Sequence, residues 1–129
     1  MKLKLALIIC GFSLLTSAAR AEMDVTTLLN KYDSATSVID KQIIAGIIDK
    51  THYGISWANA FLEDARKEAP LYCQPKRLVL TTEQILDILR REVKEQPVLG
   101  EEPYGLAMII ALRKVFPCQP NSNSGTTAH

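Results

Sequence analysis

The chain has 129 residues, of which 47% are hydrophobic and 22% charged, and its formal net charge is +1 at pH 7. This length predicts one domain. So balanced a charge gives no support for binding to nucleic acid or to an anionic lipid surface, and we expect neither as a partner.

The first 21 residues have the organisation of a secretory signal peptide. Lys2 and Lys4 form a positively charged start, and residues 5–15 form an apolar run that is too short to span a bilayer. The run is followed by Ala19-Arg20-Ala21, which fits the small-x-small cleavage rule. We therefore expect an exported protein that starts at Glu22 after cleavage.

Cleavage would remove Lys2, Lys4 and Arg20, leaving 12 basic and 14 acidic side chains and a net charge of −2. Cys10 lies in the middle of the apolar run and not at its end, so we expect no lipid anchor. No later segment is apolar for 18 residues, so we expect no membrane span after cleavage. Residues 119–129 are polar and lack apolar periodicity, which predicts a disordered tail.

Residues 22–118 have the patterning of one helical domain. A short helix is expected from Asp24, its N-cap, to Tyr32. A long helix is expected from Val38 to Lys67, with Ser37 as its N-cap, and isoleucines and other apolar residues recur along it at helical spacing. Gly54 lies inside this pattern and marks a place where the helix could bend.

Two further helices are expected in the second half of the domain. Thr81 and Gln84 have capping-box spacing and open a helix that Pro97 ends. Pro103 suits the first turn of a last helix, which ends before Pro117. This last helix is apolar on nearly all sides, which predicts a central, buried position. The fold class expected is therefore all-α, a small bundle of about four helices.

Cys73 and Cys118 are the cysteines that remain after cleavage. In an oxidising compartment, an even count without metal-ligand spacing indicates a disulfide. Because residues 96–102 form a short connection, we expect the helices on either side of it to be antiparallel neighbours. Cys73 then lies just before one helix and Cys118 just after the other, so the two are predicted to pair at the open end of this hairpin.

The sequence predicts neither catalysis nor metal binding. His52 is followed four residues later by Ser56, but a serine within a helix is not a strained nucleophile elbow. His52, Cys73 and Cys118 lack the spacing of zinc ligands, and neighbouring carboxylates are not arranged as a glycosidase pair. We therefore expect no enzyme, no metal and no cofactor, and we expect His52 to be a surface or half-buried helix residue.

An aromatic row on the long helix is the first of two candidate surfaces for a partner. Tyr53, Trp57 and Phe61 follow one another at intervals of four residues and so share one helix face. We expect this row to be core, because so long a helix must bury one stripe. The alternative is partner binding, for which tyrosine and tryptophan are favoured anchors.

The turn at residues 97–102 is the second candidate surface. It carries an apolar pair, Val98 and Leu99, and two acidic residues, Glu101 and Glu102. An apolar anchor on a projecting turn, with carboxylates to steer a basic partner, makes this turn the preferred partner-binding site. The alternative is that the apolar pair folds back onto the helix ends and the acids only complement a helix dipole.

Several short motifs are together similar to those of a known family. They are Tyr53-Gly54, Trp57, Tyr72-Cys73-x-Pro75, Pro97, Ala111-Leu112 and Phe116-Pro117-Cys118. Over residues 40–118 the chain resembles the Rap/Tai-type immunity proteins of type VI secretion. This resemblance implies a periplasmic helical protein that binds and blocks a toxic effector, in the best-known members a peptidoglycan amidase, and that often forms a homodimer. It also implies a role for Cys73 and Cys118 as the bridge cysteines. The alternative is a periplasmic acid-stress chaperone of the HdeA kind, a class that is also small, exported, helical and held by one disulfide.

Overall fold

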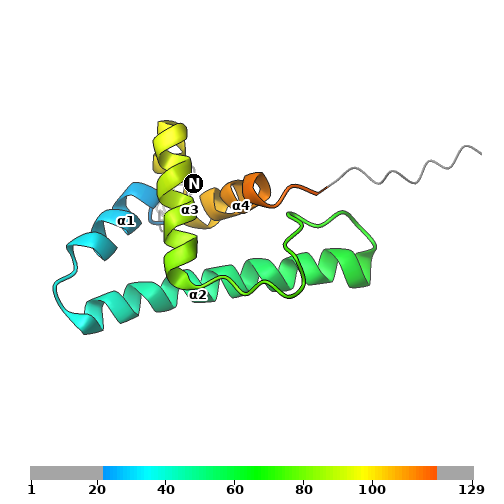
Figure 1. The fold of residues 1–129 in the computed structure, drawn as a ribbon, viewed down its shortest axis with the longest axis horizontal. Coiled ribbons are helices and arrows are strands. Elements are labelled where there is room, and N and C mark those ends of the chain that lie inside the picture. The colour runs from blue at the N-terminus through cyan, green and yellow to red at the C-terminus, as the bar shows by residue number, and fades with distance from the viewer. Residues whose placement is uncertain (1–21, 119–129) are drawn as a thin grey trace, which may run out of the picture.

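The computed structural model describes residues 22–118 (Figure 1). The helices of this part are α1 (Val25–Ser34), α2 (Val38–Ala60), α3 (Thr82–Glu95) and α4 (Tyr104–Val115), with a π-helix η2 (Phe61–Arg66) and a 3-10 helix η3 (Pro97–Glu101). Its only β pairing is an isolated bridge between Asp24 and Pro103. The predicted all-α fold with four helices is confirmed, whereas the expected signal peptide and tail lie outside the described residues.

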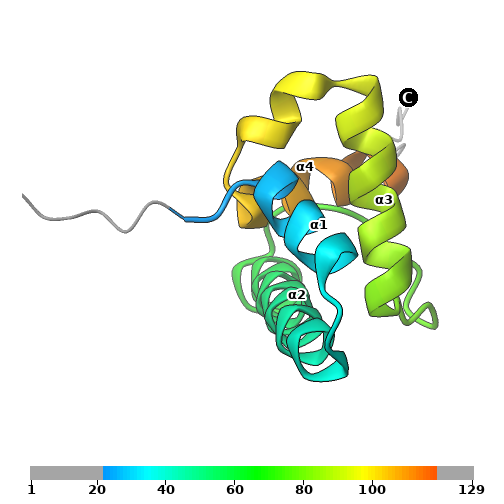
Figure 2. The same cartoon turned by 90° about the vertical axis from the view of Figure 1, so that its left-hand side faces the viewer.

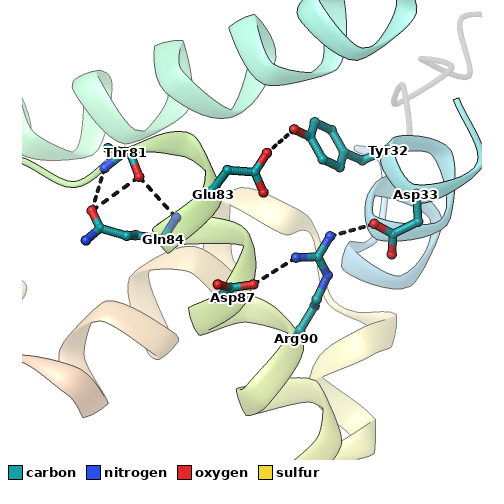
Figure 3. A network of polar contacts seen from close by, with 7 residues as sticks. All are labelled: Tyr32, Asp33, Thr81, Glu83, Gln84, Asp87 and Arg90. Atoms are coloured by element: carbon teal, nitrogen blue, oxygen red, sulfur yellow. Dashed lines mark hydrogen bonds and ion pairs between the residues drawn. The ribbon is translucent and has the colours of Figure 1, made fainter. Parts of the chain in front are cut away.

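The starts of the first three helices follow the predicted caps. The Asp24 carboxylate accepts the Thr27 N–H at 2.7 Å, a hydrogen bond that lowers the pKa of Asp24. Ser37 caps α2 by accepting the N–H of Ile39. At the start of α3, Thr81 and the side chain of Gln84 form the predicted capping box (Figure 3).

Helix α2 continues through Gly54 without a break and widens into the π geometry of η2. Lys67, with a φ of 57°, ends η2 in the left-handed conformation. Figures 1 and 2 show α2 as a rod along one edge of the molecule, with the other helices on one side of it. Its opposite side is therefore left without a packing partner.

The core lies between α1, α3, α4 and the inner side of α2. It also includes Tyr72, which lies between α2 and α3 in the sequence, and Leu99 of η3. The residues with at most 1% of their surface exposed are Val25, Leu28, Ile48, Ile85, Leu86, Leu89, Ala107, Met108, Ala111 and Leu112. Helix α4 is buried on one side only, because Leu106 and Ile110 are 46% and 39% exposed. The prediction of a central α4, buried all round, is therefore wrong.

Helices α3 and α4 cross steeply in both views and are not antiparallel neighbours (Figures 1 and 2). The Nζ atom of Lys114, in the last turn of α4, lies 2.7 Å from Glu92 and 2.5 Å from Glu95, in the last two turns of α3. In an antiparallel hairpin the last turn of α4 would meet the first turn of α3. The prediction of an antiparallel pair is wrong because η3 packs on α1 and α3 and does not form a tight turn between α3 and α4.

The predicted disulfide between Cys73 and Cys118 is confirmed, with a Cα–Cα distance of 4.9 Å. It ties the end of α4 to the connection between α2 and α3. Beside it, the Cys73 N–H donates to the Phe116 carbonyl at 2.8 Å. The bridge therefore holds a segment without regular secondary structure against the residues that follow α4.

A polar network joins the outer sides of α1 and α3 (Figure 3). Arg90 of α3 pairs with Asp87 on its own helix and reaches across to Asp33 of α1. The Tyr32 hydroxyl donates to the Glu83 carboxylate, which raises the pKa of Tyr32. These contacts lie at the surface, outside the apolar core, and join α1 to α3.

Candidate functional site: the η3 turn and the outer face of α2

The turn formed by η3 projects from the molecule on the side away from α2 (Figure 2). At this turn Val98 is 67% exposed and Glu101 is also exposed, whereas Glu102 is half-buried. Leu99 is only 4% exposed. The expectation of an exposed Val98–Leu99 pair is thus right for Val98 and wrong for Leu99, because adjacent residues of a 3-10 helix point about 120° apart and only Leu99 faces the core.

Contacts with residues 23–26 hold the turn and the residues that follow it against the start of α1. Gly100 is buried so closely against the Thr26 hydroxyl of α1 that a side chain at this position would overlap it. The carbonyl of Glu102 accepts the Val25 N–H at 3.2 Å, and the Tyr104 N–H donates to the Met23 carbonyl at 3.0 Å. The turn therefore presents Val98 and Glu101 from a fixed backbone.

The outer face of α2 is the second exposed apolar surface. We define it as Ile39, Ile43, Ile47 and the aromatic row Tyr53, Trp57 and Phe61. The members of the aromatic row are 59%, 74% and 58% exposed. The expectation that this row is core is wrong, because α2 buries its opposite side, which carries Ile48, His52 and Ile55.

Two side chains on the inner side of α2 hold the segment that leads into the disulfide. Asn59 donates to the carbonyl of Tyr72 and accepts the N–H of Leu71, both at 2.6 Å. Ser56 lies 3.2 Å from the Tyr72 hydroxyl. Sequence reasoning missed Asn59, although it continues the buried stripe of Ile48, His52 and Ile55 at helical spacing. A polar residue in such a stripe is a signal for a buried hydrogen bond.

His52 lies beside this segment and is only 8% exposed, so it is more deeply buried than predicted. Its Nε2 atom is buried and has no hydrogen-bond partner among the described residues. Burial lowers the pKa of His52 from its ordinary value of 6.5, against the opposing attraction of Asp49. Ser56 contacts Tyr72 instead of His52, so the structure does not join His52 and Ser56 as a catalytic pair.

The burial of His52 predicts an acid-sensitive fold. Because its pKa is lower in the folded than in the unfolded chain, its contribution to stability is complete above the ordinary pKa and is lost as the pH falls through it. Thermal melts between about pH 8 and pH 5.5 should show a steeper fall in Tm for the wild type than for His52→Gln, which cannot become charged. Equal slopes for the two proteins would contradict this assignment.

Two shallow hollows, of about 430 and 440 Å³, lie between α2 and residues 70–82. They meet at Ser56, Gln74 and Leu78, and His52 lines the second. Within residues 22–118, no three His, Cys, Asp or Glu side chains are grouped to hold a metal ion. None of the helices described is both long and apolar enough to cross a membrane.

Comparisons with models of protein families, with curated proteins and with solved structures find no match to this chain. The assignment of a function therefore depends on the turn, on the outer face of α2 and on the sequence motifs described above.

Proposed function

We propose that the protein is exported to the periplasm and neutralises a toxic type VI effector, such as a peptidoglycan amidase, by binding it. The observation that carries this proposal is the braced turn, where Val98 is exposed while Leu99 and Gly100 anchor the backbone. A binding loop that is already fixed loses little conformational entropy on association. Val98 supplies an apolar anchor, and Glu101 supplies a charge that steers a basic partner. The resemblance to Rap/Tai-type proteins supports the choice of effector class.

A double variant of the turn tests this proposal. Val98→Asp with Glu101→Lys is expected to weaken effector binding tenfold or more, about 1.4 kcal/mol. Both side chains are exposed, so the Tm should stay near that of the wild type. Isothermal titration with a purified type VI amidase measures the first effect and thermal melting the second.

Val79→Asp is the matched control, because Val79 is an apolar residue that is 79% exposed and lies outside the turn. This variant should bind the amidase as the wild type does. The aromatic row remains the alternative binding surface. Loss of binding in Trp57→Ala, together with wild-type affinity in the turn variant, would assign the effector to that row instead.

An acid-stress chaperone is the second candidate function, and the buried His52 favours it. Protonation of His52 would loosen the packing of α2 at low pH and add to the apolar surface already exposed. A chaperone of this kind would suppress the aggregation of unrelated proteins on acidification. An immunity protein would instead act at neutral pH, on one effector and at a fixed stoichiometry.

A further inference from the structure

The second of the two hollows lies between α2 and residues 74–82, and we call it the His52 hollow. Its volume of about 440 Å³ falls within the range of small-molecule sites, about 300 to 1,000 Å³. We propose that the His52 hollow binds a neutral saccharide ring. This inference does not depend on the proposed effector, because no residue of the turn at Val98 lines the hollow.

A buried imidazole without a partner is the first observation that points to a ligand. His52 lines the hollow and is more than nine-tenths buried, and its Nε2 atom has no hydrogen-bond partner among the described residues. Because an unpaired buried polar atom destabilises a fold, a ligand that supplies the missing hydrogen bond binds with advantage. A hydroxyl group suits Nε2 in either tautomer of the neutral ring, since a hydroxyl both donates and accepts.

The side chain of Gln74 controls access to this atom. Nε2 is sealed from solvent in the free protein, and Gln74 lies close enough to His52 to oppose the fall in its pKa without forming a hydrogen bond to Nε2. The Gln74 amide instead donates to the Leu78 carbonyl at 2.5 Å. Because residues 68–80 contain no helix or strand, Gln74 can turn aside without disturbing either, and a ligand hydroxyl then takes its place beside His52.

The charge of the hollow favours a neutral ligand over an anion. Among the described residues that line it, Asp49 is the only acidic one and there is no lysine or arginine. The Asp49 carboxylate accepts the Thr82 hydroxyl at 2.6 Å through Oδ1, so its Oδ2 atom can accept from a ligand. A carboxylate repels anions and accepts hydrogen bonds from hydroxyl groups. A ligand that is uncharged and rich in hydroxyls therefore complements this lining.

Apolar side chains and one aromatic ring supply the rest of the lining. Leu78, Val79 and Tyr53 are 36%, 79% and 59% exposed, so a ligand in the hollow can cover them. A saccharide ring carries hydroxyl groups around its edge and C–H groups on its faces, and such a face packs well on an aromatic ring. Hydroxyls for His52 and Asp49 with an apolar face for Tyr53 distinguish a saccharide from a simple organic cation, which lacks the hydroxyls.

Nuclear magnetic resonance titration of the purified protein with cellobiose, maltose and N,N′-diacetylchitobiose tests the site. At least one of these sugars should bind with a Kd of about 10 mM or tighter and shift the ring nitrogen signals of His52. Tyr53→Ala and Asp49→Asn should each weaken this binding about fivefold or more, with a Tm near that of the wild type. Trp57→Ala is the matched control, because Trp57 is the next member of the aromatic row, is 74% exposed and does not line the hollow. It should bind the sugar as the wild type does.

Three results would overturn the proposal. The first is a His52 signal that none of the three sugars shifts at about 10 mM, and the second is an unchanged affinity in Tyr53→Ala. The third concerns charge and uses galactose and galacturonate, which differ by one carboxylate. Galactose should bind more tightly, and tighter binding of galacturonate would contradict the role given to Asp49. Binding of the diamine putrescine without binding of any sugar would likewise exclude a saccharide as the ligand.

Discussion

Replacement of both bridge cysteines, Cys73→Ser with Cys118→Ser, is expected to lower the free energy of unfolding by about 4 kcal/mol. The bridge spans 45 residues of sequence, so it removes much of the freedom of the unfolded chain. In the folded chain it holds residues around Cys73 against the end of α4, beside the hydrogen bond from the Cys73 N–H to the Phe116 carbonyl. For a domain of about 100 residues this loss is a large part of the total stability.

Urea unfolding followed by circular dichroism measures this effect. The matched control is the wild type reduced with dithiothreitol, which should unfold at nearly the same urea concentration as the double variant. An unfolding midpoint close to that of the oxidised wild type, in either sample, would show that the bridge adds little to stability.

Asn59→Ala is expected to lower the free energy of unfolding by about 2 to 3 kcal/mol, because it leaves two backbone groups without partners. This is the largest effect we expect after loss of the disulfide. The Leu71 N–H and the Tyr72 carbonyl both depend on this one side chain, at 2.6 Å each. Tyr72 itself is only 2% exposed, so water cannot readily replace the lost contacts. The segment that leads into Cys73 should therefore loosen before the rest of the domain.

Hydrogen exchange at Leu71, together with a denaturant melt, measures the local and the global effect. Ser56→Ala is the control, one turn earlier on the same side of α2, because it removes a single contact with the Tyr72 hydroxyl. If Asn59→Ala were no less stable than Ser56→Ala, the role given to Asn59 would be wrong.

Features set by local chemistry were predictable from the sequence. Asp24, Ser37 and the Thr81–Gln84 box determine where helices start, because each satisfies backbone N–H groups of its own first turn. The Cys73–Cys118 pairing followed from the expectation that an exported chain keeps only these two of its three cysteines after cleavage. It holds even though the helix arrangement used to support it was wrong.

The choice of buried face was not predictable. Helix α2 has apolar residues on all sides, so periodicity could not decide whether the Ile48–Ile55 stripe or the aromatic row faces the core. The same holds for α4, whose Leu106 and Ile110 remain exposed. The crossing of α3 and α4 depends on the packing of η3 against α1, where Gly100 meets Thr26, a contact between residues far apart in the chain.

These assignments place two separate surfaces on one small domain. The turn at Val98 presents an exposed apolar side chain, and the outer face of α2 exposes three isoleucines and the aromatic row. Variants of the two surfaces should therefore affect different properties. The turn variant should lose the effector and keep the fold, whereas Ile43→Asp should keep both the fold and the affinity for the effector.

The survival of a strain that lacks this protein, grown in contact with its parent, tests the proposed immunity most directly. Survival should fall sharply when the parent's type VI system is active, and a plasmid that encodes the wild-type protein should restore it. The Val98→Asp, Glu101→Lys variant should restore it poorly although it accumulates normally. Survival that is unchanged by loss of the protein, with the parent's secretion system shown to be active, would contradict a role in immunity.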